Sequence, residues 1–215
     1  MKIPTKYKKL FLDINIKAKL NNVKITVSKE KTLPYPIGKF DCHGFFVING
    51  GYPKGELGIA TGDGLKEWIK ILIHESCHMD QFVENDINWV HNFIYDETNN
   101  KIKESVDLLD EWIKGREMSS KLVTQLVDAC LSMELDCERR AAEKIKKYNL
   151  DIDVEQYIQQ ANSYIYFYRF LEESRASYKK TPYQIKKVWS KMPKHFNNDY
   201  STVPDEFKKL FLKLL

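Results

Sequence analysis

The sequence predicts an α+β fold, with a small three-stranded sheet and a long helix in residues 1–100 and a mostly helical half in residues 101–215. Three observations lead to this prediction. Apolar residues alternate in the first part of the chain, which is typical of half-buried strands. The apolar spacing changes to the helical period near residue 65, and most of the later chain keeps that period.

The composition is typical of one soluble globular domain, which we expect to span residues 1–215 with 43% hydrophobic and 30% charged residues. The formal net charge is only +4, so we expect no nucleic-acid partner. No stretch approaches the roughly 18 apolar residues of a membrane span, and the first 20 residues lack the apolar core of a signal peptide. We therefore predict a cytoplasmic protein with no membrane partner and with free thiols.

The elements of the first half follow from the apolar spacing. Residues 5–20 predict a helix with a loose apolar stripe, and residues 21–30 predict a strand. Two further strands are expected over residues 39–50 and 55–61. A long helix is expected over residues 62–83, with Asp63 as its N-cap.

The second half is expected to be helical. Residues 84–101 are polar and aromatic and have no clear period. Helical spacing then predicts helices over residues 103–114, 117–147, 154–174 and 182–191.

The long helix of the first half contains the sequence HESCHMDQ, residues 74–81. Residues i and i+4 of a helix project from one face, so His74 and His78 can direct ring nitrogens at the same ion. Glu75 lies beside that face, where its carboxylate can accept a proton from water without binding the ion. The pattern predicts a Zn2+ site with Glu75 as the general base.

A chance match is the alternative. With 5 histidines in 215 residues, such a five-residue pattern arises by accident in on the order of one per cent of comparable chains. The position of the motif in an amphipathic helix directly after a strand favours a metal site. Cys77 is expected to point away from the histidine face, so it is not a predicted ligand.

A catalytic zinc site needs a third protein ligand. The sequence LSMELDCERRAAEKI places Glu134 and Glu138 one turn apart on a helix, among apolar and small residues. Burying two carboxylates without a cation is costly, so one is expected to bind the metal and the other to orient a ligating histidine. The alternative is an exposed acidic patch. Three other histidines have no supporting pattern and are expected at the surface or in the core: His43, His91 and His195.

The HExxH motif on one helix with a glutamate from a later helix resembles the signature of the gluzincin metallopeptidases. In several branches of that family the second helix reads Glu-x-x-small-acid, in which the first glutamate binds the metal and the last acid orients a histidine. ELDCE matches this pattern, although the last acid is usually Asp. The resemblance implies that His74, His78 and Glu134 bind zinc and that Glu138 supports a histidine. A shifted frame, ERRAA, makes Glu138 the ligand but has Ala142 in the acid position.

Three blocks, HESCHMDQ, ELDCERRAAEKIKKYNL and ANSYIYFY, resemble small metallopeptidase-like proteins encoded by tailed bacteriophages. The similarity is spread over residues 70–195, and its first two blocks are the specific ones. It implies a minimal zincin-like core of small sheet and active-site helix, zinc as cofactor, and hydrolysis of a peptide or protein substrate. For a phage-encoded protein the implied location is the host cytoplasm.

Peptide hydrolysis also needs a donor that stabilises the oxyanion. Tyr164 is the candidate, with Tyr168 on the same helix face and Asn162 just before it, and aromatic core packing is the alternative. The strand GELGIAT, residues 55–61, is expected at the edge of the sheet, where an extended substrate can pair with it.

Three hypotheses of function follow. The first is a zinc-dependent peptidase in which Glu75 deprotonates a metal-activated water. The second is a zinc-containing binding module that inhibits a host factor without hydrolysis. The third is hydrolysis of a cell-wall amide by the same residues. Glu75 favours a hydrolase, because a structural zinc site needs no base and usually has four protein ligands.

Overall fold

A computed structural model describes residues 4–36, 41–48, 54–176 and 181–214. The chain forms two compact units. The first comprises Met1–Asp86 and Arg140–Ile152, and the second comprises Ile87–Arg139 and Asp153–Leu215. Within the described ranges, no helix is both long enough and apolar enough to cross a membrane.

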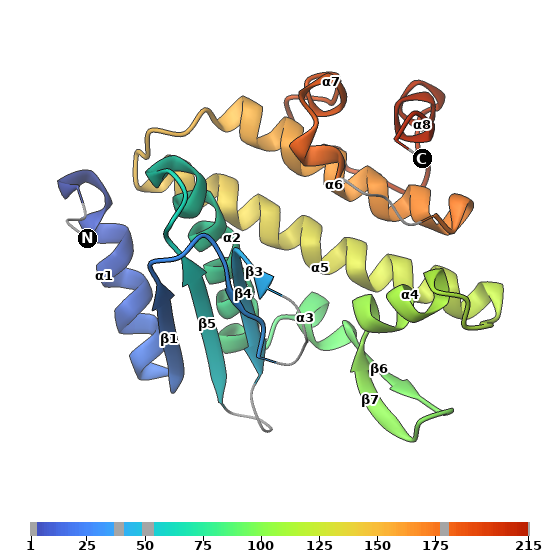
Figure 1. Ribbon diagram of the computed structural model, residues 1–215, viewed down its shortest axis with the longest axis horizontal. Coiled ribbons are helices and arrows are strands. Elements are labelled where there is room, and N and C mark those ends of the chain that lie inside the picture. The colour runs from blue at the N-terminus through green and yellow to red at the C-terminus, as the bar shows by residue number, and fades with distance from the viewer. Residues whose placement is uncertain (1–3, 37–40, 49–53, 177–180, 215) are drawn as a thin grey trace. The chain divides into compact units, whose positions relative to one another are not determined.

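The first unit combines a small sheet with two helices (Figure 1). Its sheet has the strand order β1-β5-β4, in which β1 is parallel and β4 antiparallel to β5. Helix α1 packs along β1, and α2 packs on β4 and β5. The elements are α1 Thr5–Leu20, β1 Val23–Ser28, β2 Leu33–Pro34, β3 Asp41–Cys42, β4 Gly44–Ile48, β5 Gly55–Ala60 and α2 Leu65–Glu84.

Strand β5 lies at the centre of this sheet. It pairs with β1 on one side and with β4 on the other, and most of its residues are buried. Gly58 lets the ring of Phe45 pack over the strand, since a Cβ at Gly58 would lie 2.4 Å from that ring. The expectation of GELGIAT as an edge strand is therefore wrong. Apolar alternation reports which face of a strand is buried, but it does not report the order of strands in a sheet.

Helix α2 buries its apolar side in the first unit. Trp68 is only 2% exposed, and its ring centroid lies 5.5 Å from that of Phe11 on α1. The N-cap is Gly64, with no side-chain cap, so the prediction of Asp63 as N-cap is wrong. Asp63 instead lies beside His43, with 3.3 Å between Oδ2 and Nδ1. The Asp63 carboxylate thus lies next to His43 and caps no N–H group at the start of α2.

The second unit is mostly helical, apart from one hairpin. Its elements are α3 Ile87–His91, β6 Phe93–Asp96, β7 Lys101–Glu104, α4 Ser105–Ile113, the first part of α5 Ser120–Lys147, α6 Val154–Ser174, η1 Pro182–Gln184, α7 Lys186–Trp189 and α8 Asp205–Leu212. Helices α5 and α6 run antiparallel, as two hydrogen bonds between them show: one joins Thr124 to Glu172 and the other joins Glu138 to Tyr157. Their inner faces form one apolar core that includes Val127, Ile165, Phe170 and Phe211.

The predicted α+β class is confirmed. The five longest helices begin and end within a few residues of the expected positions. The β6–β7 hairpin and the C-terminal helix α8 were not expected, because each has only one or two apolar repeats to reveal its period. The ends of one expected strand, residues 39–40 and 49–50, lie outside the described residues.

Truncating Trp68 tests the packing of α2 in the first unit. We expect Trp68→Ala to lower the free energy of unfolding by about 3–5 kcal/mol, because it removes a buried aromatic ring and leaves a cavity. Val27 is 62% exposed, so Val27→Ala is a matched control that should change the value by less than about 0.5 kcal/mol. Urea denaturation followed by circular dichroism measures both, and equal losses would contradict the packing described.

Candidate metal centre

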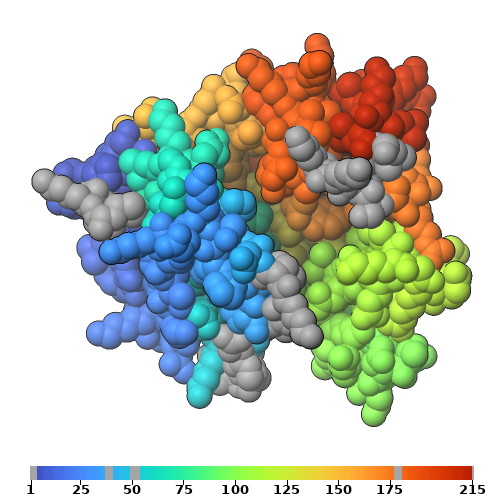
Figure 2. Space-filling model, in the orientation of Figure 1, coloured from blue at the N-terminus to red at the C-terminus, as the bar shows by residue number. Residues whose placement is uncertain are grey.

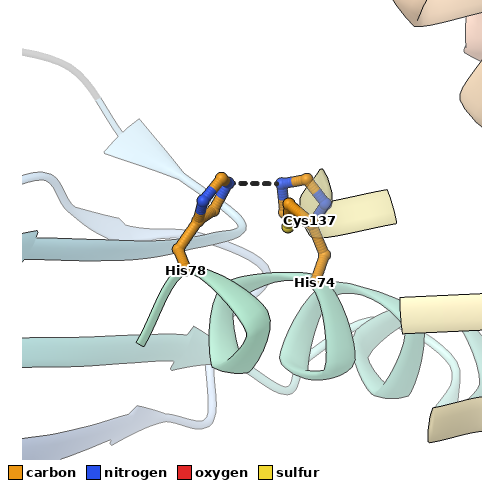
Figure 3. A group of neighbouring side chains, drawn as sticks. All are labelled: His74, His78 and Cys137. Atoms are coloured by element: carbon orange, nitrogen blue, oxygen red, sulfur yellow. Dashed lines mark hydrogen bonds between the residues drawn. The ribbon is translucent and has the colours of Figure 1, made fainter. Parts of the chain in front are cut away.

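His74 and His78 form a pair on α2. They lie one turn apart, and a nitrogen of each ring points toward the other ring (Figure 3). Their Nε2 atoms are 3.2 Å apart, and their ring planes are at 86° to each other. Two nitrogen ligands at 2.0–2.1 Å from a tetrahedral zinc ion lie about 3.3 Å apart. The pair therefore has the spacing that one ion requires, a spacing that also fits an N–H···N hydrogen bond.

Gln81 fixes the orientation of His78. Its Oε1 lies 2.8 Å from His78 Nδ1, and its side chain is fully buried. A carbonyl oxygen only accepts hydrogen bonds, so Nδ1 donates its hydrogen and the neutral ring carries its lone pair on Nε2. Ligating histidines are commonly held in this way by an outer partner. Gln81 was not predicted as a site residue. Its position three residues after His78 does place the two side chains next to each other on a helix, so the sequence could have indicated the contact.

Cys137 of α5 joins the two histidines. Its sulfur and a ring nitrogen from each histidine lie within 4.8 Å of one another, an arrangement that could hold a metal ion (Figure 3). The Cys137 side chain is fully buried. Thiolate and imidazole together are a common zinc ligand set. The sequence pattern suggested Cys137 only as the small residue of ELDCE, and its ligand chemistry was missed.

Glu134 and Glu138 are both buried, at 7% and 8% exposure. The alternative of an exposed acidic patch is therefore wrong. Glu138 Oε2 accepts a hydrogen bond from the hydroxyl of Tyr157 at 2.5 Å. Among the described residues, the group that could hold a metal ion consists of His74, His78 and Cys137, and neither glutamate belongs to it.

The tyrosine pair of α6 lies in the second unit, as does Glu134. The hydroxyl oxygens of Tyr164 and Tyr168 are 2.7 Å apart. Burial, and then the negative charge of Glu134, raise the pKa of both tyrosines well above the ordinary value. Both hydroxyls therefore keep their protons at neutral pH. One of them donates to the other, so the pair has one hydrogen left for a further acceptor.

Asn162 has a different role from the one considered for it. Its Nδ2 donates to the carbonyl oxygens of Pro193 and His195, at 2.8 and 2.9 Å, and its Oδ1 accepts from the Tyr200 hydroxyl. Both amide hydrogens are thus used to hold the segment that follows α7. The side chain has no remaining donor for a substrate.

The surroundings of Glu75 in the first unit include an edge strand. A Cβ added at Gly44 of β4 would lie 3.3 Å from Glu75 Cγ and 2.5 Å from Ile71 Cγ2, so the strand approaches the helix closely at this point. Burial and the charge of Glu75 raise the pKa of Cys42, on β3, to about 11. Among the described strands, β4 has a neighbour on one side only. The other three histidines, His43, His91 and His195, are exposed.

Comparisons with known proteins give no assignment. No protein-family model matches the chain, and neither a curated protein nor a solved structure matches it.

Replacing Gln81 tests its role in orienting His78. We expect Gln81→Leu to weaken zinc binding by about 10–100-fold, because His78 loses the acceptor that fixes its ring. Gln81→Glu is the matched control: it keeps an acceptor at the same place and should retain the affinity. Competition with a chromophoric zinc chelator measures both. Equal affinities of the Leu variant and the wild type would show that Gln81 does not position the ligand.

Proposed function

We propose that the protein is a zinc-dependent peptidase of the gluzincin type, with His74, His78 and Glu134 as ligands. The observation that carries this proposal is the spacing of 3.2 Å between the two Nε2 atoms on α2, with Glu75 on the same helix. Zinc, when bound, polarises a carbonyl group and lowers the pKa of water to about 7. Peptide hydrolysis is the reaction that this set of side chains serves best.

Glu75 is the general base in this proposal. Its carboxylate takes the proton of the attacking water and later delivers a proton to the leaving amine. The close approach of Gly44 to Ile71 and Glu75 supports the role, because it places the Glu75 side chain beside strand β4. The Cβ of a larger residue at Gly44 would clash first with Ile71 Cγ2, at 2.5 Å, and would also crowd Glu75 Cγ, at 3.3 Å.

Strand β4 is the proposed docking edge for substrate. It is antiparallel to β5 and has no other neighbour among the described strands. An extended peptide can add to such an edge through backbone hydrogen bonds. Because β4 passes Glu75 at Gly44, a peptide bound there would bring its backbone to the general base. Strand β4 thus takes the docking role that was expected for β5, which lies at the centre of the sheet.

The choice of Glu134 as third ligand is supported by its burial. A buried carboxylate is costly without a partner, so the burial of Glu134 favours a cation beside it.

Tyr164 is the proposed oxyanion donor. Its hydroxyl is protonated at neutral pH for the reasons given above, and it is paired with that of Tyr168. A protonated phenol can stabilise developing negative charge on a carbonyl oxygen. Its electrostatic coupling to Glu134 supports a place near that carboxylate.

The position of Cys137 favours a second candidate function. A thiolate from Cys137, two histidines and one glutamate would give zinc four protein ligands, which is typical of structural sites. The protein would then be a zinc-containing module that binds and inhibits a host factor without hydrolysis.

The general base is tested by Glu75→Gln. We expect this variant to keep about one equivalent of zinc but to lose at least about 100-fold in turnover, because the amide cannot accept the proton. Mass spectrometry of a peptide library detects cleavage, and metal analysis measures the zinc. Unchanged cleavage would remove Glu75 from the mechanism, and an inhibitory effect that survives the substitution would favour the binding module.

The ligand set is tested by two substitutions on α5: Glu134→Gln and Cys137→Ser. The peptidase proposal expects a loss of zinc in the Glu134 variant and retention of zinc and activity in the Cys137 variant. Zinc release from Cys137→Ser would favour the structural site. Less than about a tenth of an equivalent in purified wild type, unchanged by His74→Ala, would contradict both candidates.

A further inference from the structure

The β6–β7 hairpin of the second unit lies at the surface, within the green segment of Figure 2. The two strands form a two-stranded sheet of their own. Phe93 pairs with Glu104, and Tyr95 pairs with Ile102. Among the described residues, each strand of the hairpin therefore has one edge without a neighbouring strand.

The register shows which backbone groups face the open edge of β6. The N–H of Ser105 donates to the carbonyl of Asn92 at 2.8 Å. In an antiparallel ladder such a bond flanks a pair that is not itself hydrogen-bonded, here Phe93 and Glu104. Because the two kinds of pair alternate, Phe93 and Tyr95 both turn their N–H and C=O groups away from β7. No backbone hydrogen bond outside the hairpin ladder is found for either residue among the described residues.

A cavity of about 1200 Å³ lies along this strand. All four residues of β6 line it, and residues of α5 between Lys121 and Ser132 line it as well. None of the lining residues comes from β7. Small-molecule pockets typically have volumes of about 300–1,000 Å³. The size of the cavity and the strand along it fit an extended peptide better than a compact ligand.

The charges of the cavity are balanced. The acids Asp96 and Asp128 are neutralised by ion pairs with neighbouring basic side chains, namely Lys103, Arg116 and Arg169. Glu97 and Lys121, which have opposite charges, also line the cavity. A lining of this kind matches a partner of low net charge and disfavours a polyanion such as a nucleic acid.

The lining also exposes apolar side chains. Val90 is 41% exposed and Tyr95 is 56% exposed, and both line the cavity. Apolar groups left in contact with water favour a partner that covers them. On an added strand, alternate side chains fall on the same face, so one set can contact Val90 and Tyr95.

We propose that the open edge of β6 binds an extended peptide of low net charge with apolar residues at alternate positions. The peptide adds as a third strand of the hairpin through the backbone groups of Phe93 and Tyr95. This site uses residues of the second unit only, and the proposal does not depend on zinc or on hydrolysis.

The test compares proline at the two outer edges of the same hairpin. Tyr95→Pro removes a backbone N–H that faces the open edge of β6, without removing a bond to β7. Ile102→Pro is the matched control, because Ile102 is the cross-strand partner of Tyr95 and faces the opposite edge. The probes are three fluorescein-labelled hexapeptides with the repeats Thr-Val, Ser-Ile and Gln-Tyr, and binding to the full chain is followed by anisotropy.

We expect saturable binding of at least one peptide, about tenfold weaker binding by Tyr95→Pro, and binding within about twofold of wild type by Ile102→Pro. Tyr95→Thr removes the ring but keeps the N–H, so it should bind more tightly than Tyr95→Pro. A peptide with an N-methyl group at every residue has no free N–H on either edge and should not bind wild type, and this control does not depend on how any variant folds.

Four results would overturn the proposal. One is the absence of saturable binding by all three peptides at concentrations up to about 1 mM, where even weak protein interactions are detected. The second is equal binding by the two proline variants, and the third is binding of the N-methylated peptide. The fourth is concentration-dependent self-association that Tyr95→Pro abolishes, without peptide binding, which would assign the edge to a second copy of the chain.

Discussion

The burial of polar side chains along α2 is the constraint on which the first unit depends. His78, Asp80 and Gln81 are all buried on the helix that also supplies the apolar core. Buried polar groups destabilise a protein unless they have partners. Asp80 lies 2.6 Å from Lys17 and 2.7 Å from Lys144, and Gln81 bonds to His78. The two ion pairs of Asp80, to Lys17 of α1 and Lys144 of α5, fix the rotation of α2 about its axis and so fix the direction of the histidine face, whereas Gln81 fixes the ring of His78.

The same constraint connects the fold to the chemistry. A helix that could rotate about its axis would not keep the histidine pair pointing in one direction or keep Glu75 beside the edge strand at Gly44. The direction of the histidine pair is thus set by interactions that lie outside the proposed ligands. What separates a hydrolase from a structural zinc site is the fourth position, which either water or the thiol of Cys137 can occupy.

Sequence reasoning succeeded where a long period or a compact motif carried the information. It predicted helices α2 and α6 closely, because their apolar residues repeat over several turns. It placed β5 at an edge, because sheet order depends on contacts between distant segments. It missed Gln81, whose hydrogen bond to His78 depends on a rotamer, and it did not anticipate that Cys137 is grouped with the two histidines. The open edge of β6 follows from register, which no local pattern revealed.

In the proposed site, zinc binds with one position left open for water. X-ray absorption spectroscopy of the zinc-loaded protein identifies the ligand atoms and their distances. We expect two imidazole nitrogens at about 2.0–2.1 Å, oxygen ligands at about 2.0–2.2 Å and no sulfur. A sulfur at about 2.3 Å at full occupancy, or a spectrum without imidazole scattering, would rule out this site.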